Sequence, residues 1–331
     1  MPAHSEPPEM PRLTVLVCTH DRATLLARTL QSLNAAQRPA GWNVDLLVAA
    51  NNCRDGTHAW LDDYHRQAVE HAWLPLEWFA EPAAGKSNAL NSALPRLKSD
   101  LVAFVDDDHR VDAGYLGALC TAADRHPEAD LFCGRILPDW DGSEPAWVHD
   151  TGPYRIYPLP VPRFDQGSEG RELDADGRAI PGGGNLFLRT EWAARIGGFA
   201  TDMGPRGHDL GGAEDLDWVL RGLRMGARLR YVPEVVQYHY VDAARLTLPY
   251  LMEKAYKRTA STMGLHPGRH AAGVPRYLWR KVAGYALRAV FSPSMAGRRF
   301  YCVRTAAAMG EMAGHRAAQR RVAARSASSE A

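Results

Sequence analysis

Alternating strand-like and helix-like segments constrain the fold of this chain more than any other feature of its sequence. Apolar runs that read as buried strands occur at Leu13–Cys18, Val44–Val48, Leu76–Phe79 and Leu101–Val105. The segments between them carry helical features, beginning with leucines spaced three and four residues apart after the first run. This alternation predicts βαβ units and a mostly parallel sheet flanked by helices, with right-handed crossovers.

Polar residues directly follow three of these runs. They are Thr19-His20-Asp21, Asn51-Asn52 and Asp106-Asp107-Asp108. Ligands of parallel α/β sheets bind beyond the carboxyl ends of the strands. We therefore expect the functional site at the sheet edge where these three clusters gather.

The rest of the chain divides into a loop-rich region, a second strand–helix region and a basic helical tail. Residues 138–183 are rich in Pro, Gly, Asp and Trp and show no period. The pattern predicts a strand at Asn185–Arg189, a helix at Asp215–Met225, strands near 229–239 and helices past Leu246. We expect a disordered N-terminus at 1–11, an α/β domain at 12–245, a basic helical extension at 246–318 and a disordered tail at 319–331.

The charge is divided between an acidic body and a basic tail. Residues 251–331 hold 15 Lys and Arg against 3 Asp and Glu, a net charge of +12, whereas residues 1–250 carry −11. Basic residues mixed with aromatics such as Trp279 and Tyr285 suit an interfacial helix on an anionic membrane. The alternative is a helical cap with a charged, solvated face. We expect no nucleic-acid partner.

The cysteines and the N-terminal residues bear on the cellular compartment. Cysteines stand at Cys18, Cys53, Cys120, Cys133 and Cys302 and form no CxxC pair, so neither a zinc site nor a disulfide framework is expected. The first residues lack the apolar core of a secretory signal, and no run approaches the ~18 apolar residues of a spanning helix. We expect a cytoplasmic protein, either soluble or peripheral at the inner face of the cell membrane.

The acidic triplet at 106–108 points to a cation. Three carboxylates after a buried strand repel one another, and burial raises their pKa values. Residues i and i+2 of an extended backbone project to the same side, so Asp106 and Asp108 are expected to share one hard cation. Mg²⁺ or Mn²⁺ suits oxygen ligands together with substrate phosphates. The alternative is a solvated acidic turn.

Four further residues and a glycine run are suited to chemistry. Glu214 and Asp215 begin a predicted helix, where a carboxylate acts either as general base on an acceptor hydroxyl or only with the helix dipole. His239 ends a strand and is a candidate for a metal shell or a diphosphate contact, with a purely structural role as the alternative. Lys86 is a candidate phosphate contact near a helix N-terminus, although the glycine spacing of a P-loop is absent. The glycines before Asn185 permit a ligand to approach the backbone closely, or form a flexible turn.

The order of several motifs along the chain carries a family resemblance. The motifs are VLVCTHDR at 15–22, NNCRDGT at 51–57, GKSNALN at 85–91, FVDDDHRVDAGYL at 104–116, GGGNLFLRTEWAARIGGF at 182–199 and AEDLDWVLRGLRMGARLRYVPEVVQYHYV at 213–241. Each motif alone is weak, but the ordered combination resembles bacterial family 2 glycosyltransferases of the GT-A fold over residues 12–250.

The resemblance implies a reaction and its chemical groups. It implies a GT-A fold and an inverting single displacement, assisted by Mn²⁺ or Mg²⁺, in which a sugar leaves a nucleotide diphosphate. The metal ligands implied are Asp106, Asp108 and His239. Asp215, with Glu214 beside it, matches the acidic pair that supplies the base.

The resemblance also implies binding residues and partners. Donor-binding positions are Thr19, Asp21, Arg22, Asn51, Lys86, Asp106 and Asp107. Acceptor-binding positions are Gly184, Asn185 and Trp218, the last as a platform for a sugar ring or as core. The family often has an acid near position 51, so Asn51 leaves thymine and guanine donors open beside uracil. The partners implied are a nucleotide-diphosphate-sugar and a glycan or lipid-linked acceptor, in cell-surface polysaccharide or glycolipid synthesis.

Two other functions compete with glycosyl transfer. A sugar nucleotidyltransferase on a related fold would usually show a glycine-rich loop after the first strand, and the segment THDRATLL contains no glycine. A non-catalytic nucleotide-sugar-binding homologue would not need Asp106, Asp108 and Asp215, all of which are present.

Overall fold

The chain folds as two compact units. The computed structural model describes residues 9–174, 181–201, 214–264 and 274–329. One unit comprises Met1–Asp139 and Pro162–Tyr240, and the other comprises Trp140–Val161 and Val241–Ala331. Sequence reasoning placed residues 140–161 in the α/β domain, but Val148 and Val161 bury their side chains against Leu246 of the second unit. The expected N-terminal disorder falls largely outside the described residues.

The first four strands form the parallel half of the sheet. They are β1 (Arg12–Thr19), β2 (Asn43–Asn51), β3 (Leu76–Glu81) and β4 (Leu101–Asp106), in the order β3-β2-β1-β4. All three neighbouring pairs are parallel, as the alternating pattern predicts. The carboxyl ends of these strands therefore lie at one edge of the sheet.

The other half of the sheet contains strands of both directions. Its strands are β5 (His109–Val111), β6 (Leu131–Asp139), β7 (Arg171–Leu173), β8 (Leu186–Arg189) and β9 (Leu229–Tyr240). Strand β8 lies antiparallel between β4 and β6, and β9 runs parallel to β6. The carboxyl end of β9 thus reaches the same sheet edge as that of β4. The prediction of a mostly parallel α/β sheet is confirmed.

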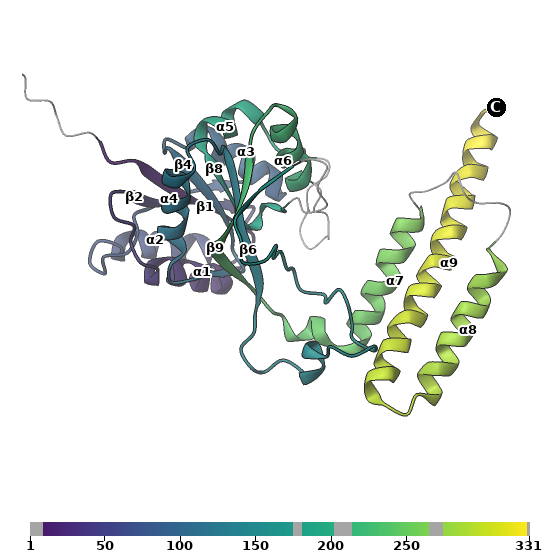
Figure 1. Ribbon diagram of the computed structural model, residues 1–331. Coiled ribbons are helices and arrows are strands. Elements are labelled where there is room, and N and C mark those ends of the chain that lie inside the picture. The colour runs from purple at the N-terminus through teal and green to yellow at the C-terminus, as the bar shows by residue number, and fades with distance from the viewer. Residues whose placement is uncertain (1–8, 175–180, 202–213, 265–273, 330–331) are drawn as a thin grey trace, which may run out of the picture. The chain divides into compact units, whose positions relative to one another are not determined.

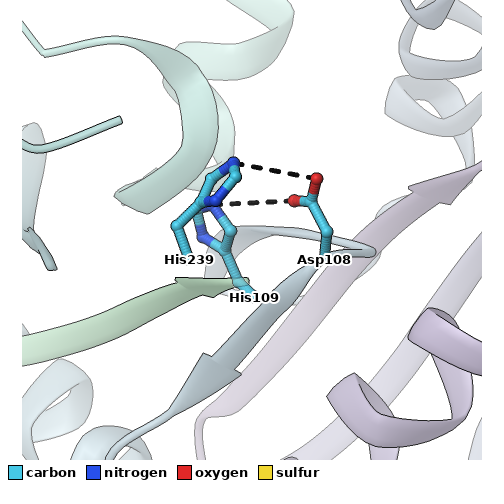
Figure 2. A group of neighbouring side chains, drawn as sticks. All are labelled: Asp108, His109 and His239. Carbon is cyan, nitrogen blue, oxygen red and sulfur yellow. Dashed lines mark ion pairs between the residues drawn. The ribbon is translucent and has the colours of Figure 1, made fainter. Parts of the chain in front are cut away.

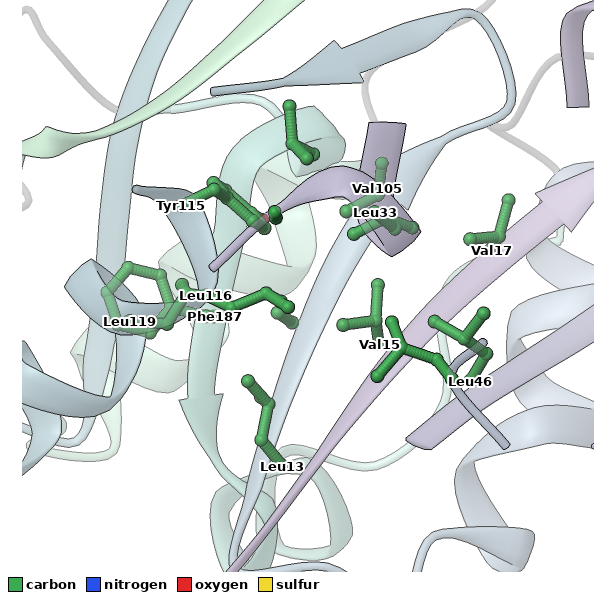
Figure 3. Packing of buried hydrophobic residues seen from close by; sticks show 14 of the residues in the cluster. Leu13, Val15, Val17, Leu33, Leu46, Val105, Tyr115, Leu116, Leu119 and Phe187 are labelled. Carbon is green, nitrogen blue, oxygen red and sulfur yellow. The ribbon is translucent and has the colours of Figure 1, made fainter. Parts of the chain in front are cut away.

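Helices cover both faces of the sheet, because successive strand residues point to opposite sides. Leu13, Val15 and Val17 of β1 face a core with α1 (Ala23–Ala35), α2 (Thr57–Gln67) and α4 (Tyr115–Arg125) (Figure 3). Leu16 and Phe104 face a second core, which contains residues of α3 (Lys86–Ala93), α5 (Thr190–Ile196) and α6 (Glu214–Arg224). The remaining short turn before β4 is the 3-10 helix η1 (Leu94–Arg96).

The second unit is helical. It contains η2 (Ala146–His149), η4 (Ala243–Leu246), α7 (Leu248–Gly264), α8 (Arg276–Phe291) and α9 (Met295–Ser329). Helices α7 and α8 both pack along α9 (Figure 1). Helix α9 continues to Ser329, whereas the sequence suggested a disordered tail from 319; the alanines of this stretch are strong helix formers. None of the described helices combines the length and apolar character needed to cross a bilayer.

Candidate functional site

The acidic triplet lies at the predicted sheet edge, but its backbone is not extended. Strand β4 ends at Asp106, and the next two residues form the turn into β5. Asp106 and Asp108 therefore do not lie on one face of an extended strand, which was the expected reason for a shared cation. The turn instead directs the three carboxylates toward three different sets of partners.

Asp106 faces a lysine and a second acid. The Nζ atom of Lys86 lies 2.7 Å from Oδ1 of Asp106 and 3.6 Å from Oδ2 of Asp215. Burial alone would lower the pKa of Lys86, but the charges of Asp106 and Asp215 raise it well above its ordinary value. Burial would likewise raise the pKa of Asp106, but Lys86 and His109 lower it below the ordinary range. These groups are therefore charged at neutral pH.

Lys86, Asp106 and Asp215 line one pocket together with Cys18 and Gly183. They come from α3, the end of β4 and the first turn of α6, which the parallel strands and their crossovers bring to one edge. Burial raises the pKa of the Cys18 thiol to about 12, so this thiol stays protonated. The pocket thus brings the side chains of Lys86, Asp106 and Asp215 together at this edge of the sheet.

Two glycines let the backbone approach these acids. Gly183 and Gly184 lie in the 3-10 helix η3 (Gly183–Asn185). A Cβ atom at Gly183 would lie 2.5 Å from Cγ of Asp215, and one at Gly184 would lie 2.9 Å from Oδ2 of Asp106. The Gly183 N–H donates to Oδ2 of Asp215 at 3.0 Å. The two glycines therefore allow the backbone to lie close to the two carboxylates, and the acceptor contact expected of Gly184 stays a prediction.

Asp107 is an internal anchor of the site. Its carboxylate accepts hydrogen bonds from the Thr19 hydroxyl at 2.8 Å and from Arg22 Nη1 at 3.0 Å. The same Arg22 nitrogen donates to Asp108 at 3.1 Å. Burial raises the pKa of Asp107 to about 6 against the opposing effect of the Arg22 charge. Thr19 and Asp107 are both buried, and Asp107 holds Arg22 in place.

Asp108 lies close to two histidines, His109 and His239 (Figure 2). Its Oδ2 atom is 3.7 Å from Nε2 of His239, and its Oδ1 atom is 3.8 Å from Nε2 of His109. One ligand atom from each residue lies within 4.8 Å of the others, which is a spacing suited to a metal ion. Burial lowers the pKa of His239, which favours the neutral imidazole that binds metals. Asp106 also lies near this group, because its Oδ2 atom is 3.9 Å from Nε2 of His109.

Asn51 and Asp21 support loops near the predicted nucleotide site. The buried Asn51 amide accepts from the Gly85 N–H at 2.8 Å and donates to the Ala83 carbonyl at 2.7 Å. Its side chain is thereby hydrogen-bonded to the loop before α3, and the expected contact with a base stays a prediction. Oδ1 of Asp21 accepts hydrogen bonds from the backbone N–H groups of Arg54 and Asp55. These bonds connect the loops after β1 and β2.

Three other predicted residues are buried. Trp218 is 0% exposed and stacks on Phe199, so the core alternative describes it and the sugar platform does not. Asn185 is also buried and donates to the carbonyl groups of Arg135 and Val235. Glu214 is 1% exposed, and burial raises its pKa. Asp215 is therefore the accessible member of the acidic pair.

Sequence reasoning missed His109 and Gln237. His109 directly follows the acidic triplet, and that adjacency was the available signal. Gln237 precedes His239 by two positions and shares its side of β9, but an isolated glutamine carries no signal of its own. Both are buried at the end of the sheet.

Comparison with known proteins assigns the chain to a family. A family model described as Glycosyl transferase family 2 matches residues 14–195, which is more than half of the chain. The chain belongs to glycosyltransferase family 2. This glycosyltransferase is 25% identical to the succinoglycan biosynthesis protein ExoM of Rhizobium meliloti, over 93% of this chain and 94% of ExoM. The assignment agrees with the resemblance and sets aside the nucleotidyltransferase and non-catalytic alternatives.

Solved structures share the fold of this glycosyltransferase. S. aureus TarS 1–349 in complex with UDP-GlcNAc has a TM-score of 0.54 and 15% identity, covering 93% of this chain and 92% of that one. This chain spans only 55% of a longer TarS chain. The mannosyltransferase PcManGT of Pyrobaculum calidifontis, in complex with GDP-Man and Mn²⁺, has a TM-score of 0.52 and 19% identity, covering 94% and 86%. The α/β unit therefore has the GT-A fold.

Proposed function

We propose that this glycosyltransferase moves a sugar from a nucleotide-diphosphate-sugar to an acceptor hydroxyl with inversion, and that Asp215 is the general base. The observation that carries the proposal is the convergence of Asp215, Lys86 and Asp106 on one pocket. Asp215 is partly exposed, at 15% of its side chain, and the Gly183 N–H fixes its orientation. An oriented carboxylate at a ligand pocket suits proton transfer from a hydroxyl group.

The proposed reaction is a single displacement at the anomeric carbon. The acceptor oxygen forms a bond to the anomeric carbon as the bond from that carbon to the diphosphate oxygen breaks. The acceptor proton passes to the carboxylate of Asp215, and the bonding electrons leave with the diphosphate. Lys86 and Arg22 lie at the same sheet edge, so their positive charges stabilise the charge that develops on the departing group.

The side chains at the end of β4 and β9 fit a divalent cation. Asp108 and His239 would hold it, with Asp106 nearby. A carboxylate with an imidazole is a donor set that accepts Mn²⁺ more readily than Mg²⁺, because imidazole is a softer ligand than oxygen. Such a cation, when bound, supplies Lewis-acid stabilisation of diphosphate oxygens.

The relatives support a proposal for the donor and for the acceptor. TarS 1–349 binds UDP-GlcNAc and PcManGT binds GDP-Man with Mn²⁺, which supports a nucleotide-sugar donor. ExoM is a succinoglycan biosynthesis protein, which supports a glycan of a cell-surface polysaccharide as the acceptor. A thermal-shift screen of uridine, thymidine and guanosine diphosphates with Mn²⁺ identifies the base that the pocket prefers.

Substitution of the base tests the mechanism. Asp215→Asn should lower kcat at least ~100-fold, because the amide cannot take the acceptor proton. Asp217→Asn is the matched control, since Asp217 is an acid of the same helix that pairs with Arg221 at 2.9 Å. Near-normal transfer by Asp215→Asn would move the role of base to Glu214. A product that keeps the anomeric configuration of the donor, seen by NMR, would rule out inversion.

Helix α8 has a surface suited to an anionic membrane. Ala283, Leu287, Val290 and Phe291 are exposed, and their spacing puts them on one side of the helix, which we call the α8 apolar face. Leu287, Val290 and Phe291 are 59%, 67% and 77% exposed. The exposed basic residues on the same helix are Arg276, Arg280 and Arg288. Apolar residues beside arginines match the surface of an anionic bilayer.

We propose that the α8 apolar face docks this glycosyltransferase peripherally on anionic phospholipid, near lipid-linked acceptors. Flotation with phosphatidylglycerol vesicles in low salt should carry the protein upward, and neutral vesicles should carry less of it. Equal recovery with both vesicle types would remove the electrostatic part of the proposal. Failure to float with either would remove the proposal.

A further inference from the structure

We propose that His109 is a third ligand of the divalent cation, and that Gln237 positions it by holding its imidazole in the tautomer that presents Nε2 to the metal. This inference rests on the proposed function, because it concerns the same metal site. It adds a ligand that sequence reasoning missed and a positioning residue outside the acidic motif.

The register of β5 and β9 brings the two histidines together. These strands are antiparallel, and His109 is paired directly with His239. Residues directly opposite in an antiparallel pair project to the same face. Their ring centroids are 5.0 Å apart, and both Nε2 atoms face the Asp108 carboxylate (Figure 2). A shift of one residue would turn one imidazole to the other face and destroy this arrangement.

The hydrogen bonds of Gln237 define which nitrogen of His109 carries the proton. Nε2 of Gln237 donates to the carbonyl of Phe104 at 3.1 Å, and a carbonyl oxygen can only accept. This contact fixes the orientation of the amide, so Oε1 of Gln237 faces Nδ1 of His109. An amide oxygen also only accepts, and Nδ1 of His109 must therefore be the donor. In the neutral ring, the lone pair then lies on Nε2.

A backbone carbonyl group fixes the same tautomer in His239. Its Nδ1 atom lies 2.6 Å from the carbonyl oxygen of Tyr240, so it also donates. When both rings are neutral, their Nε2 lone pairs are directed toward the carboxylate of Asp108. The separations of 3.7 and 3.8 Å exceed hydrogen-bonding distance. Lone pairs converging on a carboxylate repel it, and a cation among the three groups turns that repulsion into coordination.

The support behind Gln237 is itself fixed. Its Nε2 atom also contacts the Tyr115 hydroxyl at 2.7 Å and Oδ1 of Asn185 at 3.0 Å. All of these side chains are buried, so the amide cannot rotate without breaking several hydrogen bonds at once. This network extends from the core of the sheet to the metal site and explains why Asn185 is buried.

Pulsed EPR of Mn²⁺ bound to the wild-type chain tests the ligand set without any substitution. Nitrogen couplings from two imidazoles are expected in the absence of nucleotide. Coupling from one imidazole would overturn the role of His109 and leave the proposed function intact. If Mn²⁺ at millimolar concentration does not bind, both the metal part of the proposed function and this inference fail.

A pair of variants tests the positioning role of Gln237. Gln237→Met removes the acceptor for His109, and Mn²⁺ affinity measured by calorimetry should fall about 10- to 100-fold. Tyr115→Phe is the matched control, because it removes a buried partner of the same amide and leaves the contact with His109. Its Mn²⁺ affinity should stay close to that of the wild type. Equal losses in both variants would reduce Gln237 to a structural role.

Rescue and a spectroscopic readout complete the test. Gln237→Glu keeps an oxygen acceptor for His109 but replaces the donor to the Phe104 carbonyl and Asn185 with a second oxygen, so it should recover part of the Mn²⁺ affinity lost in Gln237→Met. In metal-free wild-type protein, imidazole ¹⁵N NMR should show His109 as the Nδ1–H tautomer, and Gln237→Met should show a mixture. Detection of the Nε2–H tautomer in the wild type would overturn the proposal, even if the variants did not fold.

Discussion

The carboxyl edge of the sheet and the α8 apolar face place side chains in opposite environments. At the sheet edge, polar residues such as Asp107, His109 and Gln237 are buried and hydrogen-bonded. Asp107 accepts from Thr19, and His109 donates to Gln237. On α8, Leu287 and Phe291 are apolar and exposed. Buried polar groups are stable only when their partners are fixed, whereas exposed apolar groups are stabilised by a partner outside the chain.

This difference separates two kinds of functional surface. The edge of the sheet is preorganised, because each charged group is held by another before any substrate arrives. The α8 apolar face is not organised by internal contacts in this way, and its proposed partner is a bilayer. Substitutions at the sheet edge should therefore change turnover, and those on α8 should change location with little effect on chemistry.

The largest effect is expected at the acid that faces both histidines. Asp108→Ala should lower turnover at least ~100-fold, since it removes a proposed metal ligand and the partner of Arg22. Initial rates with labelled donor measure the change. Asp21→Ala, which alters an exposed loop contact, should lower the rate far less. Full activity of the wild type in excess chelator would break the assignment of this edge as a metal site.

Two adjacent glycines test whether the fixed position of the Asp215 carboxylate controls turnover. Gly183→Ala should lower kcat about 100-fold, because its Cβ atom would lie 2.5 Å from Cγ of Asp215 and displace that carboxylate. Gly182→Ala should have little effect, since nothing lies within 4 Å of a Cβ atom there. Equal rates for the two variants would show that the position of Asp215 does not control turnover.

Substitutions on the α8 apolar face should have a smaller effect, on binding to vesicles, and no effect on the chemical step. The double variant Leu287→Ser with Phe291→Ser should weaken binding to anionic vesicles at least about tenfold, because each apolar side chain contributes ~1.5 kcal/mol or more when buried. Sedimentation with vesicles measures this affinity. Val69→Ser alters an apolar residue of the other unit that is 92% exposed, and it should bind vesicles like the wild type. Loss of transfer to a soluble acceptor in the double variant would contradict the separation of the two surfaces.

The smallest effect is expected within the helical unit. Lys281 and Glu311 join α8 to α9 through a contact of 2.6 Å that is partly exposed. Lys281→Ala should lower the free energy of unfolding by about 0.5 kcal/mol, as expected for a solvent-screened ion pair. Thermal unfolding measures the change. A loss of several kcal/mol would show that this contact is a core element of the unit.

Much of the fold, and part of the site, could be predicted from local pattern. The apolar runs gave the first four strands, and the parallel pairing followed because strand and helix alternate. The sheet edge was also predictable, since polar residues follow strands that end together. The roles of Thr19, Asn51 and Trp218 were not, because each is decided by a partner that lies far away in the chain or by burial in the core.

The sequence by itself determined which residues are apolar, how they repeat and where acids follow strands. Only the tertiary structure decided that His109 lies opposite His239, that Lys86 lies between Asp106 and Asp215, and that α8 exposes apolar side chains. The physical reason is the range of the interactions. Periodicity is local and specifies which face of an element is buried. Strand register and long-range hydrogen bonds depend on how segments more than one hundred residues apart pack together, and no local pattern encodes that pairing.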